Sequence, residues 1–304
     1  MKATNRETPT TPELRFFARA ARLQKRSEQW PLDRKIAAVR RLIWAYFEAH
    51  PRSFPWRSST DPYRILVSEV MLQQTQTARV LPKYRAWLRA LPTVRSLAQA
   101  PLPEVLSLWQ GLGYNRRAVA LRNAAREIVA KHGGRVPLDI TELEALPGVG
   151  RYTASAVCAF AANQKTVLIE TNIRTVVLYF FFAEREGVHD SEIEPLVARL
   201  CPAGRPREWY YAMMDFGVLL KRHRAAPNSM SRHYRKQTPF AGSVRQLRGE
   251  IVRSLLERRA SSVHALAERI GRPAEEVTVL VERLKHEGLV SRRGRGIALA
   301  EGSA

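Results

Sequence analysis

The stretch of sequence that decides the fold is LPGVGRYTASAVCAFAANQKTVLIETNIRTV, residues 146–176. Its opening glycines, Gly148 and Gly150, let a backbone turn sharply and approach a ligand closely. A helix that begins at Arg151 or Tyr152 would direct its free N–H groups out of this turn, and such donors suit a phosphate group. A lone GVG turn is more often an ordinary connection between two helices, so its meaning depends on the sequence around it.

The composition indicates a globular protein with an acidic polymer as its partner. The 304 residues are 45% hydrophobic and carry a formal net charge of +22, which favours nucleic acid first and an anionic membrane second. No apolar run is long enough for a membrane span, and residues 1–27 lack an apolar signal core. The two cysteines, Cys158 and Cys201, are predicted to be buried thiols. We therefore expect a cytoplasmic protein associated with the nucleoid, without a membrane partner.

A first carboxylate of interest, Glu69, stands in a helix predicted over residues 65–77. Apolar neighbours such as Val70 and Met71 would raise the pKa of its carboxyl group, which could then act as a general acid. The alternative is a solvated glutamate on the polar face of the helix. The polar run QQTQ, residues 73–76, follows and suits hydrogen bonding to bases or insertion into a base stack, or else a polar helix end.

A second carboxylate, Glu170, is predicted to lie at or beside the N-cap of another apolar helix. There the helix dipole and the free N–H groups would keep a carboxylate ionised, and Asn172 could orient it. One neutral and one charged acid is the division of roles that cleavage of an N-glycosidic bond requires.

Tyr114 follows the GLG turn at 111–113, beside Arg116 and Arg117. An aromatic side chain next to arginines can stack on a base and hold a phosphate, or it can simply pack in the core.

Helices are predicted over residues 33–50 and, in shorter pieces, over 92–130. Another starts near residue 141 and runs into LPGVG, which gives a helix–hairpin–helix.

Four motifs and their order resemble one family, the adenine (MutY-type) DNA glycosylases of the helix-hairpin-helix (HhH-GPD) superfamily. They are SEVMLQQTQ, LWQGLGY, LPGVGRYTA and the acid-x-N pattern at 170–172, and the resemblance covers about residues 33–220, including AMMDFG at 212–217. It implies an all-α, two-lobed glycosylase domain. We place this domain at residues 31–240, after a basic N-terminal arm or first helix at 1–30.

The resemblance implies roles for individual residues. Glu69 matches the general acid that protonates adenine, and Glu170 with Asn172 matches the acid-x-N motif. Gln74 matches the glutamine that wedges into the base stack, and Tyr114 matches the tyrosine that intercalates. Gly148, Val149 and Gly150 match the phosphate-binding hairpin. Gln73 and Arg151 adjoin these positions and are also predicted to bind DNA. The hairpin backbone in this family often also binds a monovalent cation.

One residue distinguishes this chain from the lyase members of the superfamily, and another departs from the family pattern. Tyr152 stands where lyase members carry a lysine, so Schiff-base chemistry loses its nucleophile and a monofunctional glycosylase is expected. Glu170 replaces aspartate and is longer by one carbon, roughly 1.5 Å. A displacement of that order can lower a rate about 100-fold, so the activity could be slower, retuned or directed at another base.

The cysteines that hold an iron–sulfur cluster in this family are absent from residues 221–240. Two cysteines elsewhere cannot supply four ligands, so no cluster and no other required cofactor are predicted. The region is instead a basic strip, predicted to contact phosphates rather than to be a solvated loop. Its members are Lys221, Arg222, Arg224, Arg232, Arg235 and Lys236.

Residues 241–304 resemble a small winged-helix (α+β) domain, with three helices followed by a hairpin. The basic turn of that hairpin, with Arg293 and Arg295, is the predicted DNA contact. The expected recognition helix, 275–285, is acidic. The usual domain that reads 8-oxoguanine is not recognisable, which puts strict specificity for that opposite base in doubt.

Two classes of function follow. The first is a monomeric enzyme that flips a mispaired or damaged base, adenine first, out of double-stranded DNA and hydrolyses its glycosidic bond; uracil, thymine or a damaged purine are alternative substrates. The second is a non-catalytic protein that binds damaged DNA. The two retained acids favour the enzyme.

The cysteine count generates a spectroscopic prediction. The purified protein should be colourless, because two cysteines cannot ligate an iron–sulfur cluster. An absorption spectrum and an iron determination on the freshly purified full chain check this. Visible absorbance together with stoichiometric iron and sulfide would contradict it.

Overall fold

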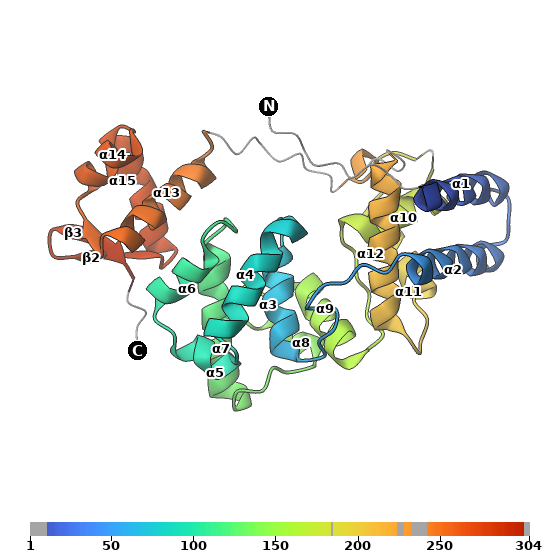
Figure 1. The fold of residues 1–304 in the computed structure, drawn as a ribbon, viewed down its shortest axis with the longest axis horizontal. Helices are drawn as coiled ribbons and strands as arrows, with labels where there is room; N and C mark the ends of the chain where they lie inside the picture. The colour runs from blue at the N-terminus through green and yellow to red at the C-terminus, as the bar shows by residue number, and fades with distance from the viewer. Residues whose placement is uncertain (1–10, 184, 224–227, 233–241, 301–304) are drawn as a thin grey trace. The chain divides into compact units, whose positions relative to one another are not determined.

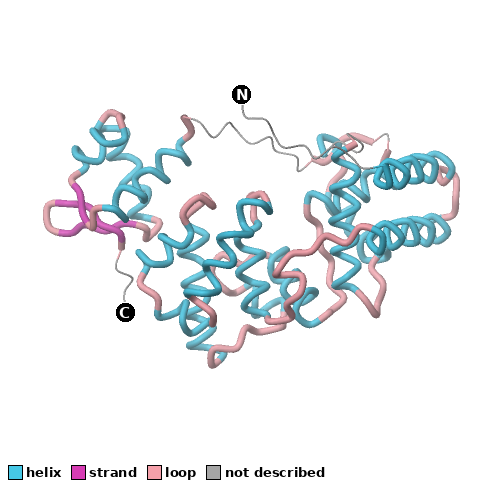
Figure 2. The backbone as a smooth tube through the Cα atoms, in the orientation of Figure 1, coloured by secondary structure: helices cyan, strands magenta, loops and turns pink. Residues whose placement is uncertain are grey.

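The structure, a computed structural model, describes residues 11–183, 185–223, 228–232 and 242–300, and these are mainly helical (Figure 2). The chain forms two compact units, each made of two chain segments. We call Met1–Ser58 with Cys158–Lys236 the α12 unit, and Ser59–Val157 with Gln237–Ala304 the hairpin unit. No helix among the described residues is long and apolar enough to cross a membrane.

The α12 unit is a packed set of helices. Its elements are α1 (Thr11–Arg26), α2 (Leu32–Ala49), α10 (Thr171–Phe181), α11 (Asp190–Leu200), α12 (Pro206–Arg222) and the short 3₁₀-helix η1 (Asn228–Met230). Helix α12 packs against α10 and α2, and α1 lies beside α2 (Figure 1). The helix predicted over 33–50 is confirmed as α2. Of the two alternatives for the N-terminal residues, those from Thr11 to Arg26 adopt the helix.

The crossing of α10 and α12 depends on Gly217. A Cβ atom at this position would lie 2.4 Å from the backbone oxygen of Asn172 and 2.7 Å from its Cβ atom. Only a residue without a side chain permits this approach, which brings the start of α10 against the middle of α12. The approach fixes the backbone that carries Asn172.

The hairpin unit is built around α3 and α7. Its elements before the C-terminal domain are α3 (Pro62–Leu72), α4 (Thr77–Ala90), α5 (Val94–Gln99), α6 (Leu102–Trp109), α7 (Arg116–His132), α8 (Ile140–Glu144) and the start of α9 (Arg151–Ala162). Helix α7 packs on α3, α5 and α6. The fully buried rings of Trp87 and Trp109 lie 5.6 Å apart in an edge arrangement within this core.

The predicted helix–hairpin–helix is formed by α8, the turn at 145–150 and α9. Asp139 caps α8 through hydrogen bonds from the N–H groups of Thr141 (2.8 Å) and Glu142 (3.0 Å). Gly148 has a φ of +74°, and a Cβ atom there would meet that of Ala120 at 2.6 Å. This turn therefore requires glycine both for its backbone conformation and for its close packing on α7.

The C-terminal residues form the predicted winged-helix arrangement. Helices α13 (Val244–Glu257), α14 (Val263–Ile270) and α15 (Ala274–His286) pack with strands β1 (Ala260–Ser261), β2 (Val290–Arg293) and β3 (Gly296–Leu299). The strands form one antiparallel sheet in the order β1-β3-β2. Ser243 and Ser262 cap α13 and α14, as expected of serines at helix starts. The domain boundary predicted at residue 240 lies outside the described residues.

The close crossing at Gly217 generates a stability prediction. Gly217→Ala should lower the free energy of unfolding by about 1–3 kcal/mol, because α10 and α12 must separate to admit a methyl group. Gly249→Ala, inside α13, is the matched control: its added Cβ meets nothing within 4 Å, so the better helix propensity of alanine should leave stability equal or higher. Urea unfolding followed by circular dichroism measures both, and equal stability of the two variants would contradict the prediction.

Candidate active site and DNA-binding surface

Glu69 occupies a buried position in α3 of the hairpin unit. The helix begins after Asp61, whose carboxylate accepts a hydrogen bond from the N–H of Tyr63 at 2.8 Å. Every residue from Ile65 to Met71 is buried, and Glu69 itself is only 7% exposed. The alternative of a solvated glutamate on a polar face is therefore wrong, because all sides of α3 face protein in this stretch.

The polar run after Glu69 is the turn that joins the end of α3 to the start of α4. Helix α3 ends at Leu72, five residues before the predicted end at residue 77. Gln74 adopts a φ of +52° and is exposed, while Gln73 donates from its side-chain amide to the hydroxyl of Thr153 at 3.1 Å. The turn thus directs Gln74 into solvent and ties Gln73 to the start of α9.

Arg117 holds this turn in place, a role that the sequence analysis missed. Its guanidinium donates to the backbone oxygens of Val70 (2.7 Å) and Gln73 (2.6 Å), and on its other side to Leu112 (3.2 Å) and Gly113 (3.0 Å). Burial lowers the pKa of Arg117 to about 10. This side chain binds carbonyl groups of the protein, which favours the packing alternative for Arg117.

A pocket of about 380 Å³ gathers most of the residues predicted to contact DNA in this unit. Its lining includes Gln73, Gln74, Tyr114, Arg116, Gly148 and Val149. Two of its residues, Gln74 (φ +52°) and Tyr114 (φ +50°), have the left-handed backbone that non-glycine residues seldom adopt. Such conformations often mark functional positions, and here both belong to residues predicted to enter the base stack.

The hairpin residues beyond Val149 lie outside that lining. Gly150 is exposed and its carbonyl accepts the N–H of Ala154 at 3.0 Å, which starts α9. Arg151 is exposed and forms an ion pair of 3.2 Å with Glu144. Tyr152, half-buried in the first turn of α9, carries a phenol where a lyase would carry an amine.

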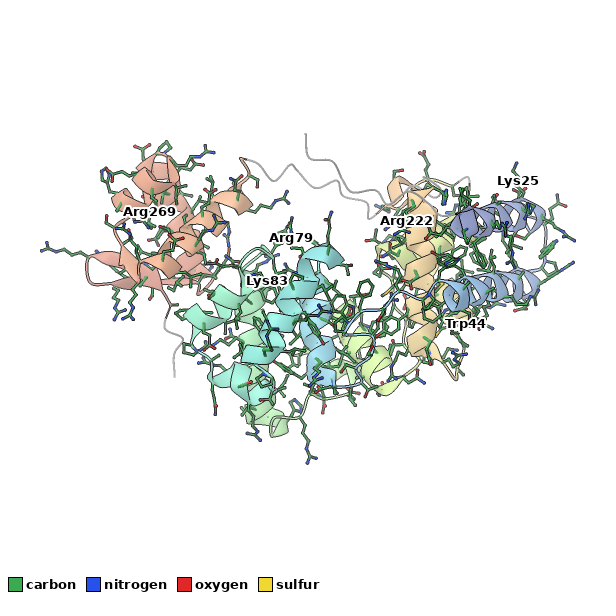
Figure 3. All side chains as sticks on the ribbon, viewed as in Figure 1. Lys25, Trp44, Arg79, Lys83, Arg222 and Arg269 are labelled. Atoms are coloured by element: carbon green, nitrogen blue, oxygen red, sulfur yellow. The ribbon has the colours of Figure 1, made fainter. Side chains whose placement is uncertain are left out.

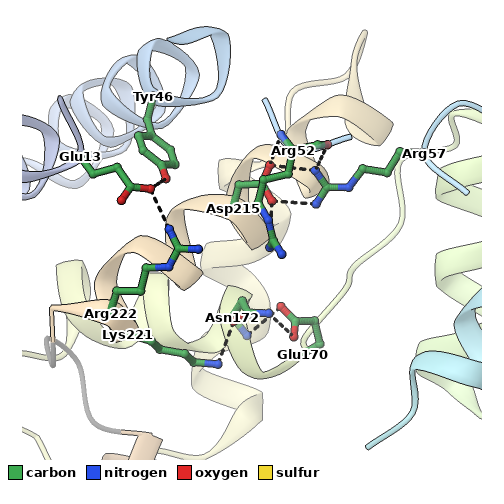
Figure 4. A network of polar contacts seen from close by, with 9 residues as sticks. All are labelled: Glu13, Tyr46, Arg52, Arg57, Glu170, Asn172, Asp215, Lys221 and Arg222. Carbon is green, nitrogen blue, oxygen red and sulfur yellow. Dashed lines mark hydrogen bonds and ion pairs between the residues drawn. The ribbon is translucent and has the colours of Figure 1, made fainter. Parts of the chain in front are cut away.

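Glu170 lies in the α12 unit, at the N-cap of α10 (Figure 4). Its carboxylate accepts the backbone N–H groups of Asn172 (2.7 Å) and Ile173 (2.9 Å). The side-chain amide of Asn172 also donates to it at 3.1 Å, which confirms the predicted orienting contact. Lys221 of α12 completes the group by donating to Asn172 Oδ1 at 2.8 Å.

Opposing influences act on the pKa of the Glu170 carboxyl, which was expected to be held ionised. Burial raises the pKa of the Glu170 carboxyl above its ordinary value. The N–H donors at the helix start and the positive charge of Lys221 oppose this rise. The N-cap geometry was predicted correctly, but the loss of water around the carboxyl group outweighs the donors.

The basic strip after α12 has contacts that differ from the prediction. Lys221 is half-buried beside Asn172, and Arg222 forms a 2.8 Å ion pair with Glu13 of α1 (Figure 4). Both side chains therefore serve internal contacts instead of a solvent-facing strip. Arg232 is exposed, and Lys236 lies outside the described residues. The predicted wing residues Arg293 and Arg295 are exposed at the β2–β3 turn.

A second ionic group in the α12 unit was also missed. Asp215, fully buried in α12, accepts two hydrogen bonds of 2.8 Å from the guanidinium of Arg57 (Figure 4). Arg52 approaches the same carboxylate at 3.6 Å. These pairs fix the FPWR segment, residues 54–57, to α12. The only signals in the sequence were that segment and AMMDFG, which spacing alone could not connect.

The residues present do not fit the iron–sulfur cluster of the family. Cys158 and Cys201 are both buried free thiols. Within the part of the chain that the structure describes, no three side chains of His, Cys, Asp or Glu are grouped to hold a metal ion. Four thiolate ligands are required, and the sequence has two.

Glu69 and Glu170 belong to different units, so their meeting across one pocket stays a prediction from the resemblance. What the structure does provide is the immediate setting of each acid. One is surrounded by helix side chains beside a strained polar turn. The other is surrounded by hydrogen-bond donors and one lysine.

Comparisons with known proteins show which proteins this chain is similar to. The family described as "HhH-GPD superfamily base excision DNA repair protein" matches residues 67–203. The adenine DNA glycosylase of Mycolicibacterium smegmatis is 33% identical over 234 residues, which cover 71% of this chain and 79% of that protein. The adenine DNA glycosylase of Rattus norvegicus is 40% identical over 195 residues. The chain spans only between about a third and a half of the length of that protein and of two further adenine DNA glycosylases.

Among solved structures, a thermostable thymine-DNA glycosylase matches with a TM-score of 0.58 and 28% identity. The match covers 61% of this chain and 87% of that one. Together with the helix–hairpin–helix and the shared motifs, these similarities show that the chain belongs to the HhH-GPD superfamily of base excision DNA repair proteins and resembles its adenine (MutY-type) DNA glycosylases.

Proposed function

We propose that this protein is a monofunctional DNA glycosylase that removes a flipped base, adenine first, from double-stranded DNA. The observation that carries the proposal is the hairpin-unit pocket. There Gln74, Tyr114 and Gly148 surround a cavity at the end of the helix that bears the buried Glu69. A flipped nucleotide requires such an arrangement, in which side chains fill the gap in the stack and a hairpin grips the phosphate.

In the proposed reaction Glu69 gives its proton to a ring nitrogen of the base. The bond between C1′ of the sugar and the base then breaks with its electrons going to the base, which leaves a positive, oxocarbenium-like sugar. The ionised form of Glu170 stabilises that charge, with Asn172 holding its orientation. Water adds to C1′, and the proton it loses restores the Glu69 carboxyl group.

The chemistry needs no metal or organic cofactor in this proposal, because both acids and their supporting donors come from the chain. With tyrosine at position 152, no amine is offered to the sugar from the start of α9. The product is therefore an intact abasic site. A monovalent cation at the hairpin backbone stays a prediction from the resemblance, and so does action as a monomer.

Two candidates follow for the identity of the excised base. The SEVMLQQTQ motif favours adenine, and the similarity to a thymine-DNA glycosylase structure makes thymine opposite guanine the second candidate. Glu170 in place of aspartate moves the carboxylate relative to the sugar. A non-catalytic role in damage binding would need neither buried acid.

A duplex panel tests the activity. We expect one mispaired base to be released and an alkali-labile abasic site to remain. Adenine opposite 8-oxoguanine or guanine is the first candidate, and thymine or uracil opposite guanine is the second. Glu69→Gln and Glu170→Gln should each lower the single-turnover rate by at least about 100-fold while duplex binding is kept. The conservative control Arg85→Lys, at an exposed position of α4, should retain turnover. Tight binding by the parent protein without release of any base would instead support the damage binder.

The setting of Glu170 also generates a pH prediction. The reaction requires the ionised form of Glu170, and burial raises the pKa of its carboxyl group. The rate should therefore increase with pH, and the midpoint of this increase should lie above the ordinary pKa of a carboxyl group. Lys221 lowers the pKa of Glu170 by its charge, so Lys221→Met should shift that limb to higher pH. Lys221→Arg keeps the charge and should leave the limb nearly in place. Single-turnover rates across a pH series measure the shift, and coincident limbs for Lys221→Met and the parent would show that Glu170 is not the titrating group.

A further inference from the structure

A basic groove lies between α1 and α2 of the α12 unit, and it shares no residue with those assigned above to base excision. It encloses about 700 Å³, and its polar lining consists of Arg19, Arg22, Lys25, Arg26, Trp30 and Arg41. The five basic residues are exposed, and Trp30 is half-buried. We propose that this groove, which we call the α1–α2 groove, binds the phosphate backbone of nucleic acid.

Helix α1 is held so that its basic face stays outward. Glu13 accepts a 2.8 Å ion pair from Arg222 of α12 and a 3.4 Å hydrogen bond from Tyr46 of α2. The ring of Phe16 packs edge-on against Tyr46 at 5.4 Å, and Ala20 is fully buried. These contacts use one side of the helix, so the other side is presented on a fixed support.

The exposed side of α1 carries a regular stripe of arginines at positions 15, 19, 22 and 26. Spacings of four, three and four residues place side chains on one face of a helix. The stripe extends over about 16 Å of helix, a length along which duplex DNA carries about ten phosphates. Lys25 extends the basic surface at the outer end of α1 (Figure 3).

The basic side chains of the groove have no ion-pair partner among the described residues. Within the residues that the structure describes, no carboxylate forms an ion pair with Arg19, Arg22 or Arg26, nor with Lys25 or Arg41. Glu28, in the turn after α1, acts electrostatically on Lys35 of α2. A cluster of unpaired cations this dense repels itself, and a polyanion relieves that repulsion.

Trp30 lies in the turn between α1 and α2 and lines the groove. The guanidinium of Arg34 lies 4.2 Å from the centre of its indole ring, and that of Arg26 lies 5.9 Å away. Stacking on a ring leaves the N–H edge of a guanidinium available, and that edge matches the two oxygens of a phosphate. The arrangement therefore favours phosphate over a single carboxylate or a neutral partner.

A nucleic acid fits better than a lipid surface. An amphipathic helix binds a membrane by inserting its apolar face, and the apolar face of α1 is already packed on α2 and α12. The groove also lies outside residues 67–203, which match the family, and α1 precedes the stretch that carries the motifs. We therefore regard it as an addition to the shared glycosylase architecture.

The test compares salt dependence of binding to a lesion-free duplex, measured on the full chain by fluorescence anisotropy. The double variant Arg22→Gln/Arg26→Gln should reduce the slope of log affinity against log salt concentration by about two, since each lost phosphate contact removes about one. The matched control is Arg85→Gln/Arg89→Gln, which removes two exposed arginines of the same spacing from α4. Its slope should equal that of the parent.

An unchanged slope in the α1 variant, or an equal loss in both variants, would overturn the proposal. Vesicles containing phosphatidylserine provide the competing outcome: loss of vesicle binding with an unchanged DNA slope would assign the groove to a membrane. The comparison does not depend on base excision, because the duplex carries no lesion. The single-turnover rate at saturating enzyme should be the same in the α1 variant and the parent, which separates the groove from the catalytic residues.

Discussion

Helices α10 and α12 cross without room for a side chain between them, and the candidate site of the α12 unit depends on that constraint. Gly217 provides the space, so the backbone of Asn172 rests directly on α12. From the next turn of α12, Lys221 then reaches the side chain of Asn172. Asn172 in turn holds Glu170. A larger residue at the crossing would move every member of this chain of contacts.

The same helix carries the other polar contacts that shape the unit. Asp215 binds Arg57 and so fixes the segment before α3, and Arg222 binds Glu13 and so fixes α1. Buried ion pairs of this kind lose much of their attraction to desolvation, and their main effect is to define geometry. One helix thus orients the catalytic candidate Glu170 and also presents the basic face of α1.

Local patterns in the sequence were sufficient for much of the fold. Apolar periodicity located α2 to within a residue, and the glycines at 148 and 150 located the hairpin turn. Glu170 was placed correctly at a helix start because an N-cap is a local feature, decided within three residues. The end of α3 was placed too late, since the polar run gave no indication that Gln74 would adopt a left-handed backbone.

The sequence by itself identified the residues that we propose to carry the chemistry, namely the acids at 69 and 170 and the hairpin glycines, and it showed that the cysteines are too few for a cluster. Only the tertiary structure decided what surrounds them. In the fold, Arg117 donates to the backbone oxygen of Val70, and Lys221 donates to the side chain of Asn172. Each contact joins residues more than forty positions apart in the sequence, so no local pattern could predict it. Burial of Glu170, and with it the upward shift of its pKa, likewise arises from helices that pack around it. Such desolvation depends on the whole fold, and no local pattern contains it.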